Sequence, residues 1–174
     1  MIKIIIPVLG LMFLVSVPAS SQVRVEAVSW ESSSPLGKTW TPFSPVAELK
    51  LAAGQRMKDK LRAVFTVRNM SRTAVEGLVL RYALRLRLVK EGEPAKVGIW
   101  SVPFRVEELR LAKSGPGQSL LVRATRFELK EQIKKLVGTG FWFDAVKLEV
   151  MVEPRRGAEL AGITQETVLP VTRP

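Results

Sequence analysis

The sequence predicts a mainly β protein: an antiparallel sandwich of two sheets with one short helix near residues 130–137. Three observations support this fold class. Apolar and polar residues alternate with a period of two over 61–68, 78–89 and much of 141–152, which is the period of a strand with one buried face. Turn-forming Gly, Pro, Asn and Ser recur between these runs. Helical spacing is confined to one short stretch, so we expect no parallel βαβ units.

The first segment, residues 1–21 (MIKIIIPVLGLMFLVSVPASS), has the three parts of a secretory signal peptide. Lys3 precedes an apolar run over 4–17, and small residues follow it. The run is shorter than the roughly 20 residues of a membrane-spanning helix. We expect cleavage near Ser21, with cleavage after Ala19 as an alternative. The chain is then exported to a periplasmic or extracellular compartment, and residues 22–174 form a single domain.

The first half of that domain begins with a predicted strand at 23–30. Residues 31–45 hold three Pro and four Ser and predict a loop. We expect the loop's Trp40 and Phe43 to pack back onto the sandwich. A short strand follows over 45–51.

The strongest strand signals lie in the centre of the chain. The first is 61–68, and a turn over 69–72 follows it. The second is 78–89, where Leu78, Leu80, Tyr82, Leu84, Leu86 and Leu88 share one face and Val79, Arg81, Ala83, Arg85, Arg87 and Val89 share the other. A helix would mix the two sets around its circumference, whereas a strand separates them.

The second half adds three strands and the helix. Residues 97–106 predict a strand whose Pro103 belongs at a sheet edge or a bulge. After a turn at 114–117, a strand is expected over 120–129. The helix at 130–137 follows, and Gly138 and Gly140 end it.

The last long strand is expected over 141–152, with Trp142, Val146, Leu148, Val150 and Val152 on one face. Asp144 interrupts that face. We expect this carboxylate either to lie at the exposed start of the strand or to pair with an arginine. A loop over 154–162 and a terminal strand over 167–171 complete the chain.

Seven or eight short strands separated by turns are typical of an immunoglobulin- or fibronectin-III-like sandwich. Residues 61–82 (LRAVFTVRNMSRTAVEGLVLRY) add a strand, an Asn-x-Ser turn and a Val-x-Gly start to the next strand. This stretch resembles the FxLYD-type and CARDB-type immunoglobulin-like modules of exported bacterial proteins. The resemblance implies a sandwich fold and an accessory or adhesive role.

The composition excludes several kinds of chemistry. The chain has no Cys and no His, so it has no thiolate nucleophile, no His-based triad and no Cys/His zinc site. Residues 37–39 (GKT) lack the first glycine of a phosphate-binding loop, because Ser32 stands there. No Ser-x-x-Lys pair occurs. The sequence 69–71 (NMS) formally accepts N-glycans, but we interpret it as a turn. We therefore predict a protein that is not an enzyme and uses no cofactor or metal.

The candidate binding residues are Arg81, Arg85 and Arg87. They share one face of the 78–89 strand in a chain of net charge +11, about 7 Å apart per two residues. Guanidinium groups in such a row can bind phosphates or carboxylates. The alternative is a solvated sheet face that discourages edge pairing.

These features predict a non-enzymatic exported envelope protein that binds an anionic envelope component through its basic sheet face. The partner is an acidic protein, an anionic polymer or a lipid headgroup, with peripheral membrane contact allowed and no nucleic acid. The alternative is a structural subunit of a larger envelope or secretion assembly, joined by strand addition at a sheet edge. The oligomeric state stays open.

Overall fold

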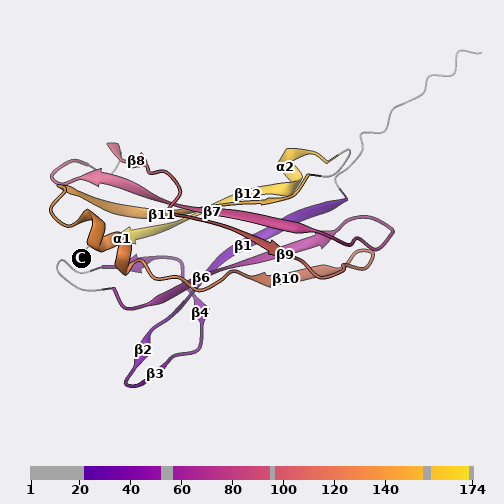
Figure 1. Ribbon diagram of the computed structural model, residues 1–174, viewed down its shortest axis with the longest axis horizontal. Coiled ribbons are helices and arrows are strands. Elements are labelled where there is room, and N and C mark those ends of the chain that lie inside the picture. Colours follow the sequence, from indigo (N-terminus) through magenta and orange to yellow (C-terminus); the bar gives the residue numbers. More distant parts are fainter. Residues whose placement is uncertain (1–21, 52–56, 95–96, 155–157, 173–174) are drawn as a thin grey trace, which may run out of the picture.

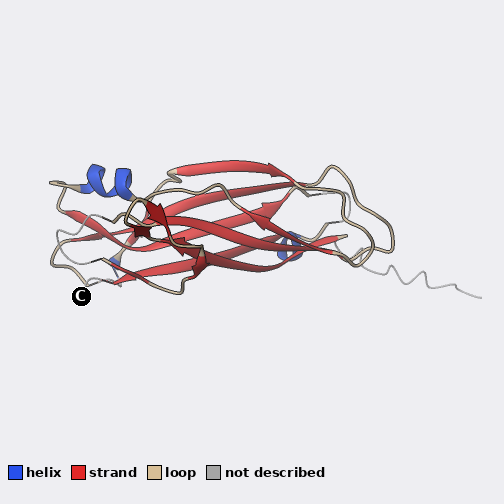
Figure 2. Cartoon of the chain, turned by 90° about the horizontal axis from the view of Figure 1, so that it is seen from below, coloured by secondary structure: helices blue, strands red, loops and turns tan. Residues whose placement is uncertain are grey.

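Two β-sheets pack face to face, with their strands along the long axis of the molecule (Figures 1 and 2). The computed structural model describes residues 22–51, 57–94, 97–154 and 158–172. The expected signal peptide, residues 1–21, lies outside these ranges. Within them, no helix has the length and hydrophobicity needed to cross a bilayer.

One sheet has four strands in the order β10-β6-β1-β4. Their bounds are Ser119–Arg123 for β10, Lys60–Asn69 for β6, Val23–Ser33 for β1 and Ser44–Pro45 for β4. All three pairings in this sheet are antiparallel. The chain enters it through β1, as the 23–30 strand predicts, and β1 extends three residues further.

The other sheet has six strands, with β7 paired to β11 on one side and to β8 and β9 on the other. Their bounds are Leu49–Lys50 for β5, Thr164–Thr172 for β12, Phe141–Val152 for β11, Val79–Lys90 for β7, Ile99–Trp100 for β8 and Arg105–Arg110 for β9. The β5–β12 pair is parallel, and the other described pairs of this sheet are antiparallel. The predicted mainly β, antiparallel sandwich is therefore confirmed.

The core lies between the two sheets and follows the predicted alternation as far as Leu86; beyond it the prediction was wrong, because Leu88 is half-buried and Val89 is buried. The inward residues of β6 and β7 are almost fully buried: Leu61, Ala63, Phe65, Val67, Leu80, Tyr82, Leu84 and Leu86. Across the core, the rings of Phe65 and Tyr82 lie 5.7 Å apart between centroids. Each such side chain contributes about 1.5–3 kcal/mol by leaving water. The separation of leucines from arginines along β7 is thus a consequence of burial.

The predicted helix is present as α1, Lys130–Leu136, at one end of the sandwich (Figure 1). Gly138 follows it with a φ of 77°, a conformation that glycine adopts without strain. The segment 154–162, expected as a loop, contains the start of a second short helix, α2, at Leu160–Ile163. Its Ile163 is buried in the core, so an apolar anchor orders this part of the segment.

The expected strand over 97–106 was wrong as a single element. It is divided into β8 and β9 around Pro103, and the intervening Val102 is 81% exposed. Both pieces pair with β7 at the edge of the sheet, the position expected for Pro103. Proline lacks an N–H and cannot continue a ladder. Likewise, the strand expected over 120–129 ends at Arg123.

The inward face of β11 also differs from the prediction. A bulge places Asp144 as an extra residue between Phe143 and Ala145, which pair with consecutive residues of β7. The bulge shifts the alternation by one residue, so Phe143 belongs to the core cluster in place of Trp142. Asp144 is only 6% exposed, so its expected position at an exposed strand start was wrong.

The expected loop over 31–45 contains a small hairpin. β2 (Pro35–Leu36) and β3 (Thr39–Trp40) pair with each other and project from the sandwich (Figure 1). Trp40 is 40% exposed but contacts the sandwich through Lys60 of β6, whose Nζ lies 3.6 Å from the ring centroid, so the expected packing is partial. Phe43 is half-buried beneath Arg62, whose guanidinium carbon lies 4.0 Å from the ring centroid.

Candidate functional site

The three predicted site residues lie together on the outer face of the six-stranded sheet. Arg81, Arg85 and Arg87 point away from the core because their neighbours Leu80, Tyr82, Leu84 and Leu86 point into it. Strand β9 flanks their strand on one side and β11 on the other. The side chains of these three arginines are between 33% and 45% exposed. We call this row the arginine stripe.

Each arginine of the stripe is paired with a carboxylate. Arg81 lies directly opposite Glu108 of β9, and its Nε is 2.6 Å from that carboxylate. Its Nη2 is 3.7 Å from Glu153, just beyond the end of β11. The strand register therefore sets an acidic residue beside the first cation of the stripe.

Arg85 faces a like charge, because its cross-strand partner on β11 is Lys147. Two cations in this position repel each other. Glu149 lies next along β11 and contacts both, with its carboxylate 2.9 Å from Arg85 Nε and 2.7 Å from Lys147 Nζ. The hydrogen bond from Lys147 lowers the pKa of Glu149 below its usual 4.5, and Arg85 lowers it further, while burial opposes both. Glu149 thus removes the repulsion between β7 and β11.

Arg87 makes the most complete pair. Its Nε and Nη2 each lie 2.6 Å from one oxygen of Asp144, the bulge residue of β11. Two parallel bonds of this kind match the planar guanidinium fork. The bond to Asp144 raises the pKa of Arg87. The expected pairing of Asp144 with an arginine is therefore present.

An aromatic ring completes this end of the stripe. Trp100 of β8 lies opposite Arg87 and is 36% exposed. The Arg87 guanidinium carbon is 5.9 Å from its ring centroid, and Lys147 Nζ is 4.9 Å away. Both distances fall in the range of cation–π attraction.

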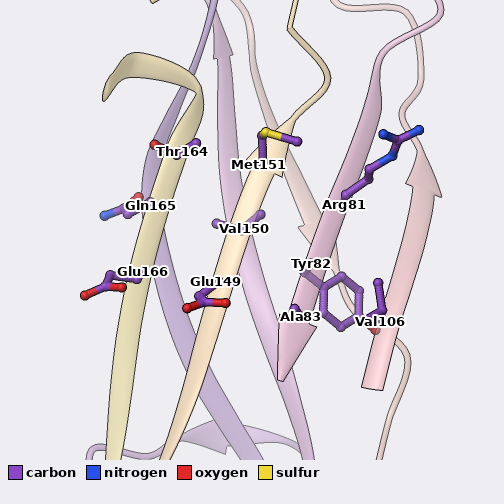
Figure 3. Close-up of a pocket in the computed structure, with 10 residues that line it drawn as sticks. All are labelled: Arg81, Tyr82, Ala83, Val106, Glu149, Val150, Met151, Thr164, Gln165 and Glu166. Atoms are coloured by element: carbon purple, nitrogen blue, oxygen red, sulfur yellow. The ribbon is translucent and has the colours of Figure 1, made fainter. Parts of the chain in front are cut away.

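A shallow, open depression of about 570 Å³ lies beside the stripe, over β12, β11, β7 and β9 (Figure 3). Ala83, Val106 and Met151 contribute apolar surface to it. Arg81, Glu149 and Glu166 contribute charged groups. An open surface of this kind suits contact with another macromolecule better than enclosure of a small molecule.

A second polar cluster lies on the inner side of the same sheet. The Tyr82 hydroxyl donates to Glu107, and Arg105 forms an ion pair with that carboxylate. Burial, followed by the bond to Glu107, raises the pKa of Tyr82 to about 12. Burial also raises the pKa of Glu107, but the bonds from Tyr82 and Arg105 outweigh it and lower the pKa overall. A phenol held this firmly in its protonated form is suited to donating a structural hydrogen bond.

Three further arginines, Arg62, Arg68 and Arg123, belong to the opposite sheet and do not join the stripe. Arg62 and Arg68 lie on β6 and Arg123 on β10, in the four-stranded sheet. Arg62 pairs with Glu31, and Arg68 pairs with Glu26.

The remaining sequence motifs occupy turns. Residues 37–39 (GKT) lie at the tip of the β2–β3 hairpin. Asn69 of the NMS sequence is 1% exposed, and its Nδ2 donates to the carbonyls of Thr73, Ser114 and Gly115. Among the described ranges, no three acidic residues are grouped as metal ligands.

Sequence reasoning identified the cations of this surface and an arginine partner as one possibility for Asp144, but it missed Glu108 and Glu149 and did not say which arginine Asp144 contacts. Glu108, Glu149 and Asp144 are distant from the stripe in sequence, and only strand register brings them to it. The sequence offered only a weak indication that Trp100 belongs to the site, because an aromatic residue near Pro103 does not by itself predict a contact with Arg87.

No family model and no curated protein matches the chain. Among solved structures, it is similar to the Pseudomonas fluorescens alkylpurine DNA glycosylase AlkC bound to DNA containing an abasic site analog. The identity is 14%, the TM-score 0.45, and the match covers 87% of this chain and 31% of that one. A crustacean hemolymph type prophenoloxidase matches with 12% identity and a TM-score of 0.42, over 88% of this chain and 34% of that one. The chain thus spans about a third of either protein, and likeness at this level carries no argument about activity.

Proposed function

We propose that this chain is a non-enzymatic, exported binding module that engages an anionic component of the cell envelope through the arginine stripe. The observation that carries the proposal is the arrangement of Arg81, Arg85 and Arg87 on one exposed sheet face, with carboxylates holding each in place.

Fixed arginines support binding because little side-chain entropy is lost when a partner arrives. Each guanidinium has five N–H donors, and its described contacts use only some of them. The exposed donors are free to bind phosphate or carboxylate oxygens of the partner. Because four carboxylates already paired with these arginines compete with an external anion, we expect moderate affinity and strong weakening by salt.

The test is co-sedimentation with vesicles of anionic phosphatidylglycerol and of neutral phosphatidylcholine, at low and high salt. We expect binding to the anionic vesicles at low salt and a loss of about tenfold with Arg81→Gln and Arg85→Gln together. Arg87 is kept in this variant because its removal would strand the buried Asp144.

The matched control carries Arg68→Gln and Arg123→Gln, which remove the same charge from the opposite sheet. It should retain most of the binding. If both double variants lose binding equally, only net charge matters, and the stripe is not the site. A soluble acidic polymer in place of vesicles distinguishes a lipid from a polymer partner.

A second candidate function is membership in a larger envelope assembly by strand addition. The supporting observation is β9, which pairs on one side with β7 and has no strand on its other side within the described ranges. The bond from Leu111 N to Leu78 O indicates that the backbone N–H groups of Val106, Glu108 and Arg110 point to the open edge.

Val106→Pro tests this alternative, because it removes an outward N–H while leaving the bonds to β7. A partner added as a strand should stay bound in envelope extracts at high salt and be lost with this variant. Retention by Val106→Pro would exclude this edge.

A further inference from the structure

The β2–β3 hairpin is a preformed arm. Residues 34–40 are exposed, and the arm projects from the sandwich (Figure 1). Ser33 Oγ donates to Thr41 O at 2.6 Å, and Ser34 N donates to Thr41 Oγ1 at 2.9 Å. At the side of the arm, Lys60 Nζ lies 3.6 Å from the Trp40 ring centroid. These contacts fix the base of the arm before any partner is present.

The tip of the arm presents an apolar side chain beside a cation. Leu36 is 65% exposed, and Lys38 follows two residues later. Gly37 between them has a φ of 61°, as a two-residue hairpin turn requires. An ordered tip with an exposed leucine costs little further entropy on docking, which makes it a suitable anchor.

The depression on the six-stranded sheet matches this tip in chemistry. Val106, 66% exposed, and Ala83 offer apolar surface (Figure 3). Glu149, which also contacts Arg85 and Lys147, and Glu166 lie beside them. The side chain of Glu166 is 66% exposed, with Lys147 Nζ 3.6 Å from its carboxylate. The apolar surface therefore suits Leu36, and the neighbouring carboxylates suit the charge of Lys38.

The two halves of this match lie on different sides of one molecule. The arm continues from β1 and returns through β4, at the edge of the four-stranded sheet. The depression lies on the solvent face of the other sheet. One arm therefore reaches the depression of a second molecule.

We propose that the arm of one chain docks in the depression of a second copy, with Leu36 against Ala83 and Val106 and with Lys38 beside Glu149 and Glu166. This contact is heterologous, so a dimer keeps one unused depression on the first molecule and one unused arm on the second, and the association can extend. The contact is small and belongs to the weak, transient class. It does not depend on the proposed binding of anions.

Sedimentation velocity over a range of protein concentrations tests the proposal. The wild-type sedimentation coefficient should rise with concentration, and Leu36→Ser should hold it near the monomer value. Val106→Lys should have the same effect, because it removes apolar surface and repels Lys38. The matched control is Leu121→Ser, which changes a leucine of β10 that is 57% exposed and should behave as wild type. Circular dichroism checks that each variant is folded.

Mixing the two defective variants gives the sharpest result. Leu36→Ser retains an intact depression, and Val106→Lys retains an intact arm. Their mixture should form heterodimers and stop there, because the remaining arm and depression are both defective. A wild-type chain that stays monomeric at every concentration overturns the proposal. So does a mixture that stays monomeric, or a Leu121→Ser variant as defective as Leu36→Ser.

Discussion

Arg87 and Asp144 form a two-bond ion pair because a bulge in β11 turns the carboxylate toward β7. The two partners are not equally placed. The Arg87 side chain is 35% exposed and can reach water, whereas that of Asp144 is 6% exposed and cannot. Loss of Arg87 therefore leaves the buried charge of Asp144 without its partner, whereas loss of Asp144 leaves an arginine that water can solvate.

We expect Arg87→Ala to lower the free energy of unfolding by about 2 kcal/mol and Asp144→Ala by about 1 kcal/mol, after allowing for solvent screening at Arg87. Urea denaturation measures both. The control Arg81→Ala breaks an exposed pair and should cost no more than about 0.5 kcal/mol. An Asp144→Ala variant as unstable as Arg87→Ala would contradict the asymmetry.

Tyr82 is the only tyrosine in the chain, so its ionisation can be followed by tyrosinate absorbance without interference. The folded protein should titrate near pH 12 and the urea-unfolded chain near 10. Since the folded pKa is the higher one, the stability from this group is complete below pH 10 and falls as the pH rises toward 12. Glu107→Gln should move the folded midpoint downward, and an unchanged midpoint would show that burial alone sets it.

Glu149 predicts how the sandwich responds to acid. Its folded pKa is lowered from 4.5, so its stabilisation is complete above pH 4.5 and is lost as the pH falls through the folded pKa. Glu149→Gln should reduce stability at neutral pH by about 1 kcal/mol, because Arg85 and Lys147 then repel each other. The variant should also lose less stability on acidification. Thermal unfolding from neutral to acidic pH, with Glu48→Gln as an exposed control, measures both effects.

Asn69 connects two turns at one end of the sandwich. Asn69→Ala leaves the carbonyls of Thr73, Ser114 and Gly115 without this donor, and we expect a loss of about 2–3 kcal/mol. Ser71→Ala, which removes only exposed or half-buried bonds to the same turn, should cost less than half as much. Chemical denaturation compares the two variants, and equal losses would show that the amide of Asn69 is not the critical group.

The elements that were predictable from sequence are those with a single strong periodicity. β6 and β7 have a buried apolar residue at every second position over 61–67 and 80–86, and α1 combines helical spacing with a following glycine. The errors have local causes that pattern alone does not reveal. In the sequence, Asp144 appears as a polar residue on an apolar strand face. In the structure it is a bulge residue, so the residues before it point to the opposite faces from those that simple alternation predicts. Pro103 indicated an edge without showing that the strand divides there.

The position of the candidate site was predictable, but the pairing of its arginines with carboxylates was not. Alternation along β7 placed Arg81, Arg85 and Arg87 on one surface. Their carboxylate partners depend on which residues of β9 and β11 stand opposite, and register is a tertiary property that one chain segment does not encode. The arm was missed because its strands have only two residues each, and its Pro and Ser content is typical of a loop.

The break at Pro103 has a consequence for solubility. An uninterrupted strand from Ile99 to Arg110 would offer a long, flat template with exposed Val102 and Val106, the kind of edge on which amyloid growth begins. Dividing it into pieces of two and six residues shortens that template. Replacing Pro103 with a β-forming residue would therefore be expected to leave the fold intact and make the protein prone to fibrils.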